Sequence, residues 1–233
     1  MSVVIRIAFA VLAGGLVWIG AGSAAEQVAG ICPNSEGGKC LGKLKAGTYK
    51  TVVFQPKLTY TVPAGWTNFE DTPGNFLLVP ARGDLLGVNA GTSEFIGIYT
   101  SVAAEARSCN PRPASGIATH PATIASWIRR QKGLVSKPAR TVAIGGLKGV
   151  SIDVMLGRGA GLHCPGYAPP YFPLLYGLSP SGLDHGMIPG LRWRLYLLSF
   201  RSGTLAIEVN DLAHGAHLAE YAAIVKQLRF ASR

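Results

Sequence analysis

Short runs of hydrophobic, β-branched and aromatic residues recur between polar turn residues from residue 47 to residue 102, which is typical of β-strands. Four such runs occur before residue 103, at residues 48–54, 58–62, 76–80 and 95–102. Turn residues separate them, notably PAG at 63–65 and DTPG at 71–74. No helical period is present in this part of the chain, so these runs predict consecutive strands of an antiparallel sheet.

Two later segments have helical spacing instead. In HPATIASWIRRQKG, residues 120–133, Pro121 suits a first helical turn, Thr119 is a candidate cap, and Gly133 is expected to end the helix. The segment at 217–230 has an apolar stripe at period 3.6. Its members are Leu218, Tyr221, Ala222, Val225 and Leu228. Both helices are expected to pack on the sheet.

The glycine-rich stretch TVAIGGLKGVSIDV, residues 141–154, raises the question of a phosphate-binding loop. Such a loop needs a strand, then glycines, then a helix whose N-terminal amides face the anion. Here the glycines are followed by Val150, Ile152 and Val154, which alternate as in a strand. The stretch therefore predicts a β-hairpin whose glycines adopt positive φ.

A second hairpin is predicted from RLYLLSF, residues 194–200, and TLAIEV, residues 204–209. Together these patterns predict an α+β fold, in which an antiparallel β-sheet has two main helices packed on it. We expect residues 47–233 to form this single domain.

Residues 157–190, between the two hairpins, are rich in glycine and proline, and they are far longer than an ordinary connection. We expect a long loop insertion. The ligand-site candidates are its aromatic side chains and two flanking arginines, namely Tyr167, Tyr171, Phe172, Tyr176, Arg192 and Arg194. Tyrosines offer an apolar face with a polar tip, and arginines suit an anionic group. The alternative is a lid whose rings only cover the sheet.

The N-terminus predicts export. Residues 1–25 contain Arg6, a glycine-diluted apolar run and a small-residue cleavage site, as in a signal peptide. An uncleaved N-terminal anchor is the alternative, whereas removal leaves no transmembrane span. The protein is then expected in the periplasm or outside a bacterial cell.

Residues 26–46 form a segment without periodicity that contains Cys32 and Cys40. With Cys109 and Cys164 they make four cysteines, an even count that favours disulfides in an exported protein. Three connectivities are possible, and we favour Cys32–Cys40 with Cys109–Cys164. A zinc site is not expected, because no closely spaced cysteine pair is present.

The net charge of the chain indicates which classes of partner it could bind. The chain carries 22 Lys and Arg against 12 Asp and Glu, a formal net charge of +10. An anionic envelope component, such as a wall polymer or acidic lipid, is one expected partner class, and a protein is the other. The basic residues are scattered along the sequence, and no nucleic-acid partner is expected. The alternative is that the charge serves solubility.

The order of these elements resembles that of Mog1/PsbP-like domains, in particular uncharacterised secreted bacterial proteins of that plan. The resemblance rests on AGTY…LTYTVPAGW, on VAIGGLKGVSIDV and on the final QLRF, and it spans roughly residues 47–230. It implies a sheet with packed helices and a binding or assembly role with no catalytic residues to carry over. We therefore expect a non-catalytic binding or scaffolding domain without a cofactor.

The alternative function is a secreted hydrolase with an unfamiliar site. The chain has neither GxSxG nor SxxK, and a hydrolase would need His163 or His185 beside a nucleophile, an acid or a metal. In DLAHGAH, Asp211, His214 and His217 could share a helix face as metal ligands. Because Asp211 is also a natural helix cap, the two histidines have no fixed third ligand, although His185 or His163 could reach them, and we expect no metal there.

Overall fold

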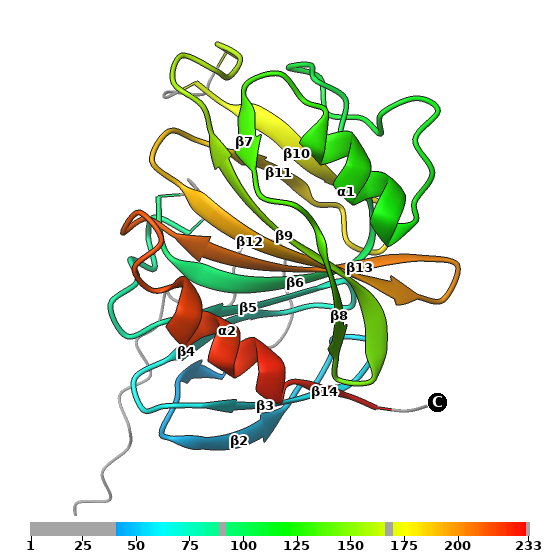
Figure 1. Ribbon diagram of the computed structural model, residues 1–233. Helices are drawn as coiled ribbons and strands as arrows, with labels where there is room; N and C mark the ends of the chain where they lie inside the picture. Colours follow the sequence, from blue (N-terminus) through cyan, green and yellow to red (C-terminus); the bar gives the residue numbers. More distant parts are fainter. Residues whose placement is uncertain (1–40, 89–91, 166–169, 232–233) are drawn as a thin grey trace, which may run out of the picture.

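The computed structural model describes residues 41–88, 92–165 and 170–231 (Figure 1). The predicted signal peptide, the Cys32–Cys40 pair and Tyr167 lie outside these residues. The main sheet has eleven strands. They are β1 (Gly42–Lys43), β4 (Thr67–Asp71), β5 (Asn75–Val79), β6 (Phe95–Ala104), β7 (Leu134–Ser136), β8 (Arg140–Ile144), β9 (Leu147–Leu156), β10 (Phe172–Gly177), β11 (Asp184–Met187), β12 (Arg192–Phe200) and β13 (Gly203–Asp211).

A second, three-stranded sheet has the order β14-β3-β2. Its strands are β2 (Gly47–Lys50), β3 (Leu58–Val62) and β14 (Arg229–Phe230), and it joins the two ends of the domain. The helices are α1 (Pro121–Arg129) and α2 (Leu218–Gln227). In the described ranges, no helix is long and apolar enough to cross a membrane.

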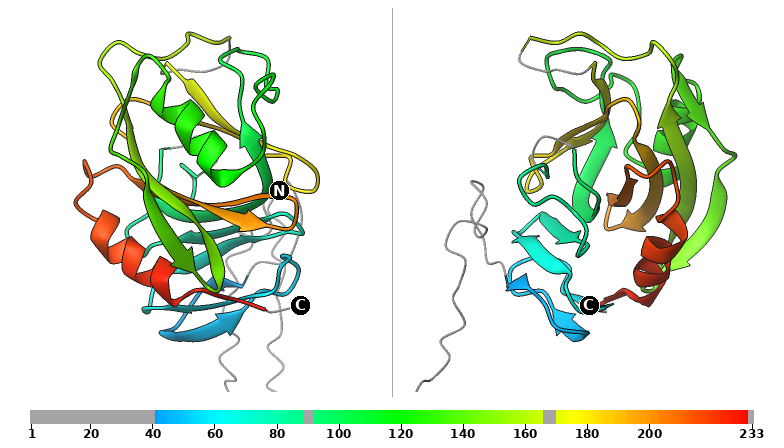
Figure 2. Two further views of the ribbon diagram at one scale, coloured as in Figure 1. Left: turned by 45° about the vertical axis from the view of Figure 1, so that its right-hand side comes forward. Right: turned by 90° about the vertical axis from the view of Figure 1, so that its left-hand side faces the viewer.

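The strands of the main sheet pair antiparallel in the order β1-β4-β5-β6-β13-β12-β9-β7. Strands β7 and β8 pair with successive parts of β9, so together they form one edge of the sheet. Strand β10 pairs with the end of β6 and extends the sheet there. The predicted α+β fold, an antiparallel sheet with two helices packed on it, is thus confirmed. Figure 2 shows the β10–β11 hairpin and the small sheet at opposite ends of the molecule.

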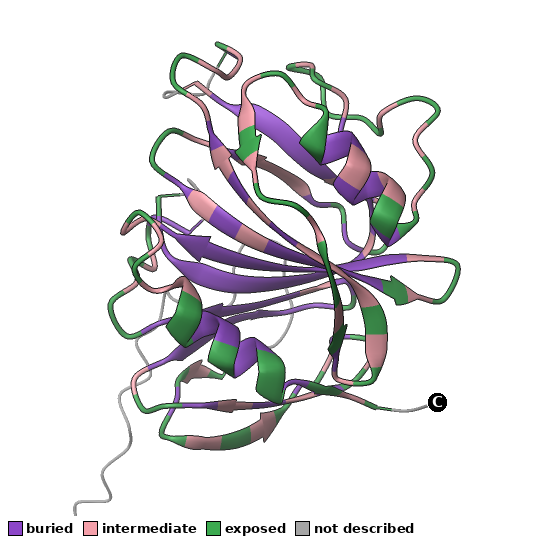
Figure 3. Cartoon of the chain, in the orientation of Figure 1, coloured by how far each residue is buried: buried purple, intermediate pink, exposed green. Residues whose placement is uncertain are grey.

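Both faces of the central strands are buried, and alternate residues serve different cores (Figure 3). On β6, Phe95 and Tyr99 point into one apolar cluster, whereas Ile96 and Ile98 point into the other. Helix α1 covers the first cluster with Ile124, Trp127 and Ile128, among others, and α2 covers the second with Tyr221, Ile224 and Val225. The apolar run of β6 in the sequence therefore reflects a strand buried on two faces rather than one.

Helix α1 begins where the proline predicts, but its cap differs from the expectation. The N-cap residue is His120, and no side chain caps the first turn. Thr119 instead accepts a hydrogen bond at its backbone oxygen from the Thr204 hydroxyl, at 2.6 Å. Thr119 thus ties the start of α1 to β13 rather than capping the helix.

The predicted strand at 48–54 is also shorter than expected. The strand ends at Lys50, and the amides of Val52, Val53 and Phe54 all donate to the Asp71 carboxylate, at 2.6, 3.1 and 2.7 Å. Three hydrogen bonds to one buried carboxylate fix a bend that the alternating pattern does not reveal.

The glycine-rich stretch is a hairpin, as predicted. Strands β8 and β9 flank Gly145 and Gly146, whose φ angles are +57° and +90°. Gly149 has a different function, because a Cβ on it would lie 2.0 Å from the Leu197 carbonyl oxygen. Its lack of a side chain allows β9 and β12 to pair closely.

The expectation of one long loop over residues 157–190 needs correction. Within it, β10 pairs with β6 and with β11, so the segment adds a hairpin to the sheet. The run YFPLLY buries a continuous apolar surface that a loop would expose, and pairing satisfies its backbone groups. Pro173 coincides with an irregular register between β10 and β11.

The Cys109–Cys164 disulfide is present, as predicted, with the two Cα atoms 5.4 Å apart. It joins the segment before α1 to the segment after β9, across a sequence separation of 55 residues. Closing so long a loop restricts the unfolded chain more than the folded one.

We therefore expect the double variant Cys109→Ser/Cys164→Ser to unfold more easily than the wild type, by roughly 2–4 kcal/mol. Urea denaturation under non-reducing conditions measures this difference without disturbing Cys32 and Cys40. An unchanged free energy of unfolding would contradict the structural role of the bridge.

Candidate functional site

Acidic and basic side chains are separated between the inside and the outside of this protein. Among the described acidic residues, Asp84 and Glu220 are exposed, and Asp153 and Asp184 are half-buried. The buried ones are Glu70, Asp71, Glu94, Glu105, Glu208 and Asp211. Every described Lys and Arg is exposed, except the half-buried Arg192 and Arg194. The described exterior is therefore strongly basic, more so than the net charge alone indicates.

The cations are concentrated at one edge of the main sheet. Residues 106–152 contain no Asp or Glu. This segment contains α1, the edge strands β7 and β8, and the first part of their partner β9. We call its exposed cations the basic edge, and they are Arg129, Arg130, Lys132, Lys137, Arg140 and Lys148. Arg107 adjoins it, since its guanidinium donates to the Lys132 carbonyl oxygen at 3.3 Å.

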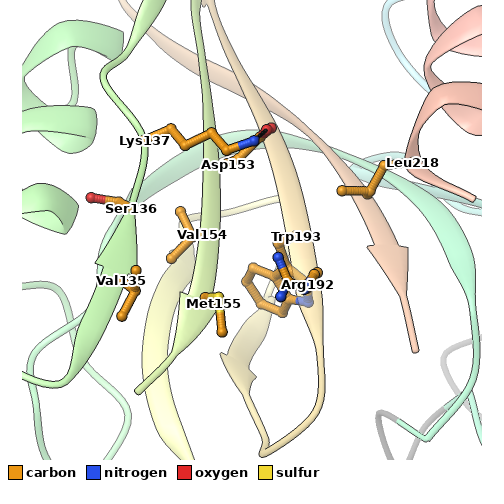
Figure 4. Close-up of a pocket in the computed structure, with 9 residues that line it drawn as sticks. All are labelled: Val135, Ser136, Lys137, Asp153, Val154, Met155, Arg192, Trp193 and Leu218. Carbon is orange, nitrogen blue, oxygen red and sulfur yellow. Dashed lines mark ion pairs between the residues drawn. The ribbon is translucent and has the colours of Figure 1, made fainter. Parts of the chain in front are cut away.

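A groove of about 120 Å³ lies beside the basic edge, between β7, β9, β12 and the start of α2 (Figure 4). Val135, Val154, Met155, Trp193 and Leu218 provide its apolar lining. Ser136, Lys137, Asp153 and Arg192 provide the polar lining. The groove therefore combines an apolar surface with cations, which suits a small anionic group with an apolar neighbour.

The two predicted arginines differ in what they can bind. Arg194 forms a two-pronged pair with Asp153, with Nε–Oδ1 at 2.6 Å and Nη2–Oδ2 at 2.9 Å. This hydrogen-bonded pair raises the pKa of Arg194 and lowers that of Asp153. Lys137 adds a second cation, with Nζ 3.6 Å from Asp153 Oδ2. Arg192 has no ion-pair partner within the described chain, so its guanidinium is available to an incoming anion.

The predicted aromatic residues lie elsewhere, on the β10–β11 side of the sheet. Tyr171 is 8% exposed and donates a hydrogen bond to Asp184 Oδ1 at 2.7 Å, and Phe172 is fully buried. Tyr176 is half-buried on β10. The structure thus brings Arg192 and Arg194 together but separates them from these rings. Burial of Tyr171 and Phe172 fits the lid alternative, and a ligand role for them stays a prediction.

His185, which a hydrolase would require, lies in a buried polar cluster. Its Nδ1 is 2.7 Å from Oε2 of the fully buried Glu208, and its ring packs against Phe95, Tyr99 and Trp193. Burial lowers the pKa of His185, but the charge and hydrogen bond of Glu208 outweigh this effect and raise it overall. In the described ranges, no Ser, Thr or Cys side chain is hydrogen-bonded to His185. His185 thus lies beside an acid, as the hydrolase alternative requires, and the hydrogen bonds of the described ranges join no nucleophile to it.

Two glycines make room for this cluster. A Cβ on Gly97 would lie 2.1 Å from the Tyr99 hydroxyl oxygen, and one on Gly186 would lie 2.5 Å from the Tyr171 ring. Gly97 is also paired with Glu208 across the β6–β13 ladder. Sequence reasoning missed Glu208, because a single acid within an alternating strand looks like a solvent-facing residue.

Glu105, at the end of β6, provides a direct test of this polar interior. Its side chain is fully buried, and burial together with the nearby Asp184 carboxylate raises its pKa to about 9. A carboxyl group whose pKa is higher in the folded state stabilises the fold at low pH. It loses that contribution as pH rises from its unfolded pKa towards the folded one.

We therefore expect Glu105→Gln, which mimics the protonated acid, to be more stable than the wild type at pH 8 but similar near pH 4.5. The gain at pH 8 should be roughly 1–3 kcal/mol in the free energy of unfolding. Urea denaturation at several pH values gives the comparison, in which the other titrating groups are common to both proteins. If the free energy of unfolding depended on pH in the same way in both proteins, the pKa of Glu105 would not be raised in the folded state.

Comparisons with known proteins give structural similarities only. No family model matches the chain, and no curated protein matches it. A crystal structure from Bacteroides thetaiotaomicron VPI-5482 is similar over 76% of this chain at 12% identity and a TM-score of 0.33. This chain spans 46% of that protein's length. The solution structure of PsbP (CyanoP) from Synechocystis sp. PCC 6803 is similar over 83% of this chain and 98% of its own, at 10% identity and a TM-score of 0.37. A PsbP protein is therefore among the solved structures to which the chain is similar.

Proposed function

We propose that this protein is an exported, non-catalytic binding domain that docks on an anionic component of the cell envelope through its basic edge. The observation that carries the proposal is the separation of charge. The described acids are mostly inside the fold, whereas the described cations are almost all on the surface. Such a surface attracts polyanions, and the attraction weakens as salt increases.

The basic edge is better suited to this role than the rest of the surface. The carboxylate nearest to these cations in sequence is Asp153 on β9, which lies 3.6 Å from Lys137 Nζ. Asp153 is already neutralised by Arg194. Arg192 and the groove then supply a half-buried site next to the exposed lysines of the edge, where one anionic group can be held by a guanidinium.

Export is supported by the Cys109–Cys164 disulfide, since such bridges persist in oxidising compartments. The N-terminal signal-like sequence points to the same location. Charged side chains along a sheet edge also prevent pairing with other sheets, which is an alternative reason for the same charges. Binding experiments separate the two explanations.

We expect the protein to bind a soluble polyanion, dextran sulfate, and vesicles containing phosphatidylglycerol, but not neutral phosphatidylcholine vesicles. Because the contact is electrostatic, raising the salt concentration from 0.05 to 0.5 M should weaken binding at least about tenfold. The triple variant Arg129→Gln/Arg130→Gln/Lys132→Gln should lose about fivefold or more in affinity at low salt, since it removes the cations at the end of α1.

The matched control is Lys43→Gln/Lys45→Gln/Lys50→Gln, which removes the same charge from exposed positions in β1 and β2 and between them. This control should retain affinity within about twofold. Equal losses in both triple variants would indicate a response to net charge alone. Absence of binding to both anionic probes would rule out the proposed partner class.

A further inference from the structure

A second polar cluster lies at the start of α2, on the opposite side of the sheet from His185. It consists of Glu94 just before β6, Asp211 at the end of β13, and His217 just before α2. One ligand atom from each residue lies within 4.8 Å of the other two. The sequence suggested Asp211 with His214 and His217, but His214 is exposed and Glu94 takes its place.

The distances within this cluster suit a metal ion. His217 Nδ1 is 3.0 Å from Glu94 Oε1 and 3.9 Å from Asp211 Oδ1. Zinc bonds to such ligands are about 2.0–2.2 Å long, which places neighbouring ligand atoms of a tetrahedral site about 3.4 Å apart. Small shifts of the side chains would therefore bring all three atoms into a first coordination shell.

The ligands are held in position by the surrounding structure. The amides of Ala213 and His217 donate to the two oxygens of the Asp211 carboxylate, at 2.6 and 2.7 Å. The Tyr221 hydroxyl donates to Glu94 Oε2, which leaves Oε1 facing His217. Such outer contacts orient metal ligands in known sites.

Charge and access both favour a cation here. Glu94 and Asp211 are buried, and Glu220 stands close by with Arg82 between it and Glu94. Arg82 pairs with Glu94 and Glu220, and Arg192 lies opposite Asp211 across the β12–β13 ladder, with no ion pair to it in the described structure. The His217 side chain is 26% exposed, so an ion has a path from solvent to the buried oxygens.

We propose that Glu94, Asp211 and His217 bind a divalent transition-metal ion of the zinc class. One imidazole and two carboxylates form a mixed nitrogen and oxygen donor set that suits Zn²⁺ better than Mg²⁺ or Ca²⁺. The three side chains come from separate segments, so the ion would link the start of α2 to the ends of β6 and β13. The competing explanation is that His217, when protonated, is itself the counter-ion.

The test is calorimetric titration of the full chain, without a histidine tag and after treatment with a chelator. We expect one Zn²⁺ per chain in the wild type and an increase in melting temperature on binding. His217→Ala should weaken Zn²⁺ binding by at least about tenfold and abolish the thermal shift. The control is His214→Asn, because His214 is exposed at φ +56° and asparagine tolerates that conformation. It should bind within about twofold of the wild type.

Circular dichroism checks that each variant folds. If His217→Ala does not fold, Glu94→Gln provides the same test, because it keeps an oxygen acceptor for Tyr221 but removes the ligand charge. The proposal is overturned if the wild type does not bind one Zn²⁺. It is also overturned if a folded His217→Ala or Glu94→Gln variant binds Zn²⁺ as well as the wild type does.

Discussion

The antiparallel ladder of β6, β13, β12 and β9 is the constraint on which the rest of this structure depends. Its central strands β6 and β13 are buried on both faces, so their side chains pack almost entirely inside the protein, mostly in one of two apolar clusters. A helix covers each face. Polar side chains on these strands must therefore find partners inside the protein, as Glu208 does with His185 and Asp211 does with the backbone ahead of α2.

This requirement explains the distribution of charge. Aspartate and glutamate side chains are short, so nearby backbone amides and hydroxyls can donate the hydrogen bonds that their carboxylates need. Asp71, for example, accepts hydrogen bonds from three successive backbone amides. Long lysine and arginine side chains reach water from the edges of the sheet instead. Placing the acids inside for structural reasons leaves the exterior basic, and that exterior is the surface that we propose to be functional.

Much of the fold follows from sequence pattern, because period-two runs and two amphipathic helices are local signals. The hairpin at Gly145 and Gly146 and the Cys109–Cys164 bridge were also predictable. The β10–β11 hairpin was not, since a continuous apolar run interrupted by Pro173 matches neither a loop nor an alternating strand. Glu94 was missed because its partners lie more than a hundred residues later in the chain. The basic edge was missed because its cations are spread along the sequence, and pairing of β7 and β8 with β9 gathers them.

The most direct test of the account is a lysine-labelling footprint with and without dextran sulfate, read by mass spectrometry. If the basic edge is the docking surface, Lys132, Lys137 and Lys148 should be protected from acetylation in the complex. Lys43, Lys45 and Lys50 should stay reactive, because they lie in β1, in β2 and between them, and are also exposed without the polyanion. Uniform protection of all six lysines, or protection of the second group alone, would contradict the assignment of binding to this edge.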